Sequence, residues 1–204
     1  MTTAVQLRPW SADDLPVLER NNAPEMTVHL GGPESPEKVR DRHERYQRHW
    51  LEGTAWMFTA RVDDEPVGLV GYWNTTHEGR DVFECAYGIL PEFQGRGLAA
   101  AAMQDCLAHA ALHGTRDDVY AYPKVTNGPS NALCKRLGFV LEGEQDFEYP
   151  KGHPIRANAW RYALSPLRQA SVRAGDPQAV NVWAGTGFRS ATTGTVADII
   201  TELA

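Results

Sequence analysis

A run of alternating residues in the middle of the chain, VFECAYGIL at residues 82–90, predicts a β-strand. Its two faces would carry different side chains, with Phe83, Cys85, Tyr87 and Ile89 on one and Val82, Glu84, Ala86, Gly88 and Leu90 on the other. Pro91 cannot donate a ladder hydrogen bond, so strand pairing should end there. Beyond a glycine turn, small and apolar residues at helical spacing predict a helix to about His113, with Gly114 as its stop signal.

Hydrophobic periodicity divides the rest of the chain into strands and helices. Strands are expected at residues 5–9, 55–62, 65–73, 118–122, 139–144 and 160–164. Helices are expected after Ser11 to about residue 20, from residue 36 to about 51, and from 129 or 130 to 137. Loops are expected at residues 21–33 and 75–80, and a hairpin turn at Asp63-Asp64. Because each helix lies between strands, the sequence predicts an α/β fold, a mixed sheet with helices on both faces.

The turn between the central strand and its helix is a candidate anion site. Its sequence is Gln94-Gly95-Arg96-Gly97-Leu98-Ala99. Glycines let the backbone turn tightly and bring several N–H groups together at a helix N-terminus, where the helix dipole also favours anions. Such a turn can hold a pyrophosphate. It matches neither the nucleotide P-loop nor the dinucleotide fingerprint, and an ordinary glycine turn explains the six residues equally well.

Three stretches in this order resemble motifs of the Gcn5-related N-acetyltransferase (GNAT) superfamily. The glycine turn resembles its acetyl-CoA-binding motif. Residues 127–139, NGPSNALCKRLGF, resemble its second motif, an Asn-led helix ending in Leu-Gly-Phe, and residues 65–72, EPVGLVGY, resemble its glycine-punctuated third strand. The resemblance covers about residues 4–164 and is closest to the ribosomal-protein N-acetyltransferase-like branch. It implies a GNAT domain over residues 1–166, with two strands splayed apart at the acetyl-CoA site.

The resemblance also implies an activity, the transfer of an acetyl group from acetyl-CoA, as co-substrate, to a primary amine by direct attack. The acceptor would be a small cationic amine or a protein N-terminus. The cofactor-binding residues that it implies are Ile89 and Leu90 for the thioester arm, Gln94, Gly95, Arg96, Gly97, Leu98 and Ala99 for the pyrophosphate, and Asn127, Ser130 and Asn131 for the pantetheine. Two alternatives stay open. The Arg96 side chain could point to water, and Ser130 and Asn131 could merely cap the helix.

Two residues are candidates for the proton transfers. Glu84 is a carboxylate in an otherwise apolar strand, where burial would raise its pKa toward the range of a general base; the alternative is that it only attracts a cationic amine. Cys134 stands where many GNAT relatives carry a tyrosine that protonates the leaving thiolate. A thiol could donate that proton, but buried cysteines more often serve packing. This departure leaves a second function open, a non-catalytic acyl-CoA-binding or interaction module.

Composition limits the remaining possibilities. The 204 residues, 42% hydrophobic and 23% charged, suit one soluble domain with a full core. A net charge of −6 disfavours a broad nucleic-acid surface and fits a small-molecule or peptide amine better. The three cysteines and seven histidines show no metal-ligand spacing, so we expect no metal site and reduced thiols, and we expect His43 to be packed. No signal peptide and no apolar run of ~20 residues is evident, which predicts a cytoplasmic protein without membrane contact.

The last part of the chain, residues 167–204, falls outside the GNAT pattern. Residues 180–183 resemble a strand, 184–187 a glycine turn and 196–203 a helix, and together they faintly resemble the end of a nitronate monooxygenase. One such unit cannot form the eight-stranded barrel that a flavin site requires. We expect an extension that packs on the domain, contacts a second subunit in a homodimer, or stays partly disordered. Nearer the domain, Asp146, Glu148, Tyr149 and His153 could line the acceptor pocket.

Overall fold

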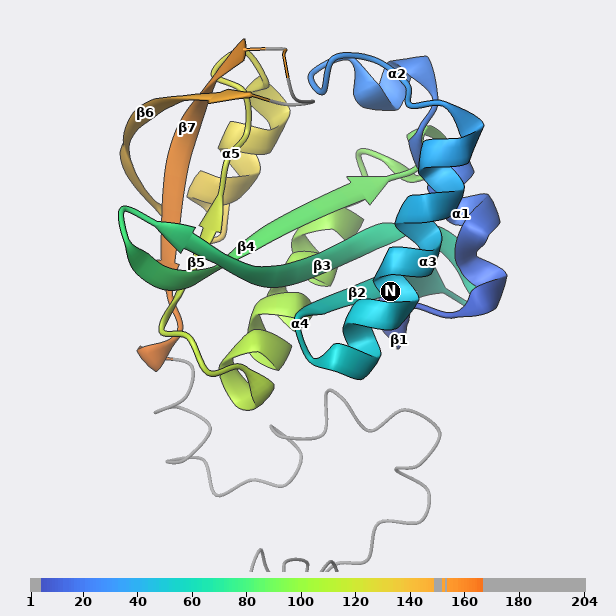
Figure 1. Ribbon diagram of the computed structural model, residues 1–204, viewed down its shortest axis with the longest axis horizontal. Coiled ribbons are helices and arrows are strands. Elements are labelled where there is room, and N and C mark those ends of the chain that lie inside the picture. Colours follow the sequence, from blue (N-terminus) through green and yellow to red (C-terminus); the bar gives the residue numbers. More distant parts are fainter. Residues whose placement is uncertain (1–4, 149–151, 153, 167–204) are drawn as a thin grey trace, which may run out of the picture.

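The computed structural model describes residues 5–148, 152 and 154–166. In this part of the chain seven strands form one sheet in the order β1-β2-β3-β4-β5-β7-β6 (Figure 1). The strands are β1 Gln6–Pro9, β2 Ala55–Val62, β3 Glu65–His77, β4 Arg80–Ile89, β5 Asp118–Ala121, β6 Val140–Glu148 and β7 Pro154–Ala163. Neighbouring strands are antiparallel except β4 and β5, which are parallel, so the predicted mixed sheet is confirmed. The predictions for Tyr149, His153 and residues 167–204 lie outside the described residues.

Helices connect and cover the strands. They are α1 Leu15–Asn21, α2 Pro24–Thr27, α3 Pro36–Glu52, α4 Leu98–His113 and α5 Gly128–Arg136, with 3-10 turns at η1 Ala12–Asp14 and η2 Pro91–Phe93. The long helix α3 starts at a Ser35 cap and ends at Gly53, whose φ of 63° closes the helix in the left-handed region. None of the described helices is long and apolar enough to cross a membrane.

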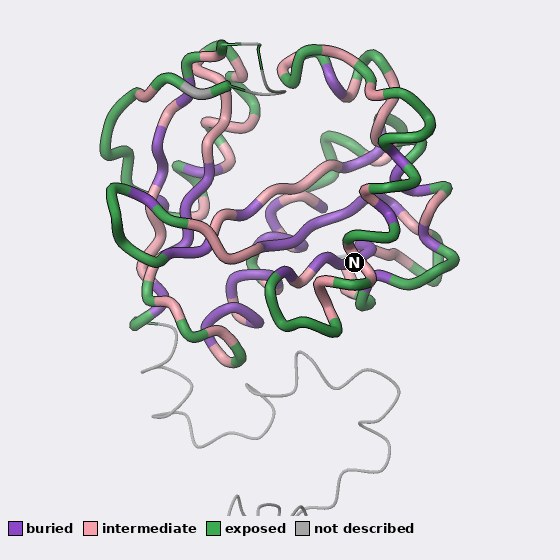
Figure 2. The backbone as a smooth tube through the Cα atoms, viewed as in Figure 1, coloured by how far each residue is buried: buried purple, intermediate pink, exposed green. Residues whose placement is uncertain are grey.

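Two hydrophobic clusters lie on opposite faces of the sheet. Successive side chains of β2 separate them, since Met57 packs with Leu18 of α1 and Val39 of α3, whereas Phe58 packs with Met103 of α4. Figure 2 shows the middle strands and the inner side of α4 as the buried part of the molecule. Helices therefore cover both faces, as the sequence predicts.

Two loops of the prediction are wrong. The stretch expected as a polar connection at residues 75–80 is a tight hairpin, in which β3 continues to His77 and β4 begins at Arg80. Glu78 and Gly79, with φ of 49° and 77°, make the two-residue turn that suits such hairpins. The loop expected at residues 21–33 contains the single helical turn α2, which starts at Pro24, a residue suited to the first helical position.

Other predictions agree or are extended. Asp63 and Asp64 form the expected hairpin turn, with φ of 48° and 65°. His43 is packed, accepting a 3.1 Å hydrogen bond from the indole of Trp10. The last two strands are longer than expected, and Arg156 of β7 forms ion pairs with Glu144 and Asp146 of β6 in the added length.

The one parallel pair of strands separates soon after it forms. β4 and β5 are paired only at Phe83 with Val119 and Glu84 with Tyr120, although β4 continues to Ile89. Pro123, shortly after the end of β5, has no backbone N–H with which to extend the ladder. The second half of β4 is therefore open on its β5 side, which is the predicted splay.

Candidate active site

A cleft of about 1630 Å³ occupies this opening. It is lined by β4, by the glycine turn before α4 and by α5, and on its other side by α1, α2 and α3. Figure 1 shows α2 and α3 on one side of the molecule and α5 on the other, with β4 running between them. The cleft thus brings together residues of all three sequence motifs, since Leu69 of β3 also lines it.

The glycine turn presents unused hydrogen-bond donors to this cleft. Gly95 and Gly97 have φ of 73° and 78°, and a side chain placed at either would meet nothing within 4 Å. Among the described residues, the N–H groups of residues 95–99 make no hydrogen bond. Five consecutive free donors at a helix N-terminus, with open space in front, fit the diphosphate of a coenzyme A molecule.

The side chains of the turn behave differently from its backbone. Gln94 lines the cleft and donates from Nε2 to the carbonyl of Ile89 at 2.8 Å, which fixes the turn against the strand end. Arg96 folds back instead. Its guanidinium donates to the carbonyl of Glu92 at 2.7 Å and lies over the Phe93 ring, 5.4 Å from the centroid. Arg96 is exposed and does not line the cleft, which agrees with the alternative that its side chain points to water.

The end of β4 supplies one backbone donor rather than two. Leu90 is fully buried and donates its N–H to the carbonyl of Val67 at 2.9 Å, so the expected contact of Leu90 with the thioester arm is not available. Backbone groups alternate in direction along an antiparallel ladder. Since Leu90 points its N–H at β3, the N–H of Ile89 points toward the β5 side, and Ile89 lines the cleft.

Asn127 and Asn131 at the N-terminus of α5 have different surroundings. Asn127 lines the cleft and accepts from the Ser130 N–H at 3.2 Å as the helix cap. Asn131 is turned inward. Its amide donates to the carbonyls of residues 124 and 127, and its oxygen accepts from Asn158 and Trp160 of β7. Asn131 makes these four bonds and is not among the residues that line the cleft, which favours the alternative of a structural role at the helix start.

A pair of hydroxyl groups lines the cleft, whereas Cys134 does not. Cys134 is 2% exposed, burial raises its pKa to about 12, and it does not line the cleft. Beside it, the hydroxyls of Tyr87 and Ser130 lie 2.7 Å apart, and both residues line the cleft. Burial raises the pKa of Tyr87 to about 12, so it stays protonated near neutral pH. The sequence pattern placed Tyr87 on its strand face but gave no sign that it approaches Ser130.

Glu84 lies in the cleft on the opposite face of β4. Burial raises its pKa from 4.5 to about 7, and a hydrogen bond from the side chain of Trp73, its ladder neighbour, acts in the opposite direction. Ala86 and Gly88 follow on the same face and leave room beside the carboxylate. A Cβ at Gly88 would collide with Oδ1 of Asn21 on α1, so a larger residue there would displace the Asn21 side chain.

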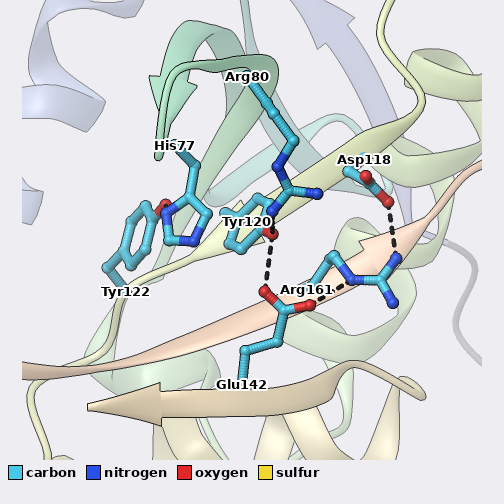
Figure 3. Close-up of polar contacts among 7 residues, drawn as sticks. All are labelled: His77, Arg80, Asp118, Tyr120, Tyr122, Glu142 and Arg161. Atoms are coloured by element: carbon cyan, nitrogen blue, oxygen red, sulfur yellow. Dashed lines mark hydrogen bonds and ion pairs between the residues drawn. The ribbon is translucent and has the colours of Figure 1, made fainter. Parts of the chain in front are cut away.

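A polar network fixes the strand ends next to Glu84 (Figure 3). It joins β3 to β7 through His77, Arg80, Asp118, Tyr120, Tyr122, Glu142 and Arg161. Tyr120 donates to Glu142 at 2.8 Å, and Arg161 donates to both Glu142 and Asp118. The Tyr122 hydroxyl lies 2.9 Å from Nδ1 of His77, and Tyr122 lines the cleft together with Glu84. Among the described residues no group of three potential metal ligands is found.

The family model described as "Acetyltransferase (GNAT) domain" matches residues 5–140. The chain belongs to this family. The curated spermidine N(1)-acetyltransferase of Escherichia coli K12 is 28% identical over 148 residues, 72% of this chain and 78% of that protein. The ribosomal-protein-serine acetyltransferase of the same organism is 31% identical over 91 residues, 45% of this chain and 50% of that protein.

A solved structure supports the same fold. Spermidine N-acetyltransferase from Vibrio cholerae, in complex with CoA and spermine, has a TM-score of 0.67 at 22% identity, covering 80% of this chain and 97% of that one. The protein is therefore a GNAT acetyltransferase that moves an acetyl group from acetyl-CoA to an amine, and a ribosomal-protein acetyltransferase is among its relatives. Family membership favours an enzyme over the non-catalytic binding module.

Proposed function

We propose that Glu84 is the general base of this N-acetyltransferase and that Tyr87, hydrogen-bonded to Ser130, is the proton donor. One observation carries the assignment of the base. Glu84 is a half-buried carboxylate in the cleft whose pKa is raised to about 7. A base with a pKa near the working pH combines a large ionised fraction with useful proton affinity.

Acetyl-CoA supplies the thioester: the amine nitrogen bonds to the acetyl carbon, and the C–S bond breaks with its electron pair on sulfur. Glu84 takes the proton that the amine nitrogen loses. The Tyr87 hydroxyl gives a proton to the departing sulfur, and Ser130 orients it at 2.7 Å. The backbone N–H of Ile89, left without a strand partner, is placed to polarise the acetyl carbonyl. Asn127 supports the pantetheine arm.

The acceptor is a primary amine, either a small cationic amine or a protein N-terminus. The two named relatives act on spermidine and on a ribosomal-protein serine. We assign the catalytic domain to residues 1–166, because β7 completes the sheet at Ala163. A chain without residues 167–204 should then keep its affinity for acetyl-CoA. Homodimer formation stays a prediction, which light scattering of the full-length chain and of the chain without residues 167–204 can test.

Kinetics of Glu84→Gln test the base. The amide keeps size and hydrogen bonding but removes basicity, so turnover should fall by ~10²–10⁴-fold with little change in acetyl-CoA affinity. The parental rate should rise with pH through about 7, as Glu84 ionises, and this step should vanish in the variant. The exposed Glu78→Gln in the β3–β4 turn is a matched control. A variant with parental turnover and a raised Michaelis constant would show that Glu84 only attracts the amine.

Stability gives an independent readout on Glu84. Because folding raises its pKa from 4.5 to about 7, the folded state binds the proton more tightly than the unfolded state. The stabilisation is fully present below about pH 4.5 and is lost as pH rises through 7. Glu84→Gln should therefore be more stable than the parent by roughly 1–3 kcal/mol near pH 8 and about equal near pH 4. Chemical unfolding at both pH values measures this difference.

A further inference from the structure

Glu84 and α3 share one side of the sheet. Trp73 is the ladder neighbour of Glu84, and Leu69, on the same face of β3, packs in one cluster with Val39 of α3. Tyr87, three residues after Glu84, lies on the α4 side. An amine that approaches Glu84 on its own face of the sheet has α3 as the neighbouring wall of the cleft. The side chains of α3 that line this wall are therefore placed to select the acceptor.

Helix α3 separates its charges by face. Its basic side chains in the cleft lining, here called the basic stripe, are Lys38, Arg42, Arg45 and His49. Their spacing of four, three and four residues places them on one side of a helix. The acidic residues of this fully described helix, none of which lines the cleft, are Glu37, Asp41, Glu44 and Glu52. The wall is thus basic even though the whole chain carries a net charge of −6.

Two members of the basic stripe have no charge partner. Lys38 and Arg45 are exposed and form no ion pair with any residue that the structure describes. Arg42 pairs with Glu34, and the pair neutralises an acidic residue that also lines the cleft. Unpaired cations along a concave wall attract anionic ligands and repel polycations.

The other carboxylates of the cleft do not offer a matching acidic row. Glu25 is a single exposed residue on α2, and Glu148, at the end of β6, accepts a hydrogen bond from the Gly152 N–H at 3.3 Å. A polyamine carries charges spaced along its whole length and needs several carboxylates in register with them. The basic stripe spans ~16 Å at 1.5 Å per helical residue, which is the length of about five extended residues.

We propose that the acceptor is the N-terminal amine of an acidic peptide, with carboxylates in about its first five residues lying along the basic stripe. The proposal rests on acetyl transfer at Glu84 as described above. The peptide amine enters on the α1–α3 face, Glu84 receives its proton, and Lys38 and Arg45 hold the acidic side chains that follow. Selection works through charge that the peptide carries beyond its reacting group, so it appears mainly in the Michaelis constant and weakens with salt.

The test compares an acidic peptide with its near-isosteric amide peptide, and both with two cationic amines. Thiol release from acetyl-CoA is measured with the hexapeptides Ser-Ala-Asp-Glu-Ala-Glu, Ser-Ala-Asn-Gln-Ala-Gln and Ser-Ala-Lys-Lys-Ala-Lys, and with spermidine. The acidic peptide should exceed the amide peptide in kcat/KM by ~10-fold or more at low salt, and the ratio should shrink in ~0.5 M salt. The lysine peptide and spermidine should be the poorest acceptors.

Charge reversal on α3 ties the preference to the stripe. In the double variant Lys38→Glu, Arg45→Glu the ratio of acidic to amide peptide should fall by ~10-fold or more, whereas Arg40→Glu, on the same helix but outside the cleft lining, should leave it unchanged. All three positions are exposed, so the fold is expected to persist. Equal use of the three peptides, or a preference for spermidine, overturns this inference and leaves acetyl transfer intact. No thiol release with any amine overturns the proposed function itself.

Discussion

Two helices begin at the same cleft, and their N-termini are built in opposite ways. At α5 the first donors are already used: the Gly128 N–H bonds to the carbonyl of Thr126, Pro129 has none, and the Ser130 N–H bonds to the Asn127 side chain. At α4 the N–H groups of residues 95–99 make no hydrogen bond within the described chain. Both helices lie in motifs that the family resemblance associates with coenzyme A.

This difference in hydrogen bonding suits the two helix N-termini to different tasks. A helix start that is capped by its own residues holds shape without a ligand, and it positions Ser130 toward Tyr87. A start with free donors is open to an acceptor from outside the chain, because no residue of the described fold already occupies those N–H groups. We therefore propose that the α4 end binds the cofactor and that the α5 end positions Ser130, and substitutions should separate the two roles.

The N-terminus of α4, with its free N–H groups, is here called the open end, and the capped N-terminus of α5 the closed end. The largest effect is expected at the open end. Gly97→Glu places a carboxylate and side-chain bulk in the glycine turn and should weaken acetyl-CoA binding by ~100-fold or more. Gly79→Glu is the matched control, because Gly79 has nearly the same φ, 77° against 78°, has open space around it and lies outside the cleft lining. Calorimetric titration measures the affinity. In the parent and the control, acetyl-CoA at ~100 times its dissociation constant should add about 2.7 kcal/mol of stability. Equal affinity in both variants would remove the assignment of the turn.

At the closed end the expected effect is on stability. Asn131→Ala removes four hydrogen bonds that join α5 to its preceding loop and to β7, and should cost roughly 2–4 kcal/mol of unfolding free energy. Asn158→Ala removes one partner of this set and should cost less. The folded variants should bind acetyl-CoA within a few-fold of the parent. A large loss of affinity without a loss of stability would make Asn131 a ligand after all.

The smallest effect on acetyl-CoA affinity is expected for Arg96. This residue is part of the glycine turn, but its side chain is directed away from the free N–H groups, toward Glu92 and Phe93. Arg96→Ala should change acetyl-CoA affinity by less than about 2-fold, because its guanidinium is bonded to the Glu92 carbonyl and packed on Phe93. A loss of about 10-fold that depends on salt would mean that the side chain leaves this position to bind phosphate.

The open end could be predicted from sequence because its geometry is local. Gly95 and Gly97 require the positive φ that the pattern indicated, and a helix start follows from the residues after them. The strand with Glu84 was predictable for the same reason, since alternation alone assigns its faces. The hairpin at residues 75–80 was missed because polar Thr75 and Thr76 suggested a loop, although β-branched threonine suits a strand.

The roles at the closed end depend on distant packing and could not be derived from local pattern. Asn131 finds its partners on β7, and Cys134 is covered by core residues from several elements. The N–H of Leu90 is bonded to the carbonyl of Val67 on β3, and the Tyr87 hydroxyl is hydrogen-bonded to Ser130, 43 residues away in the sequence. Each of these outcomes depends on how the strands and helices assemble, which no short motif contains.

The burial of the three cysteines has a practical consequence for the assay. Cys85, Cys106 and Cys134 are at most 5% exposed, and burial raises the pKa of Cys134 to about 12. An aromatic disulfide reagent reacts only with thiolates that it can reach. It should therefore react rapidly with released coenzyme A and give an absorbance signal, whereas the buried thiols of the native chain should not react on that timescale. Over longer times the three thiols should react only when the structure opens. The same cuvette would therefore record turnover in seconds and the opening rate of the core in hours.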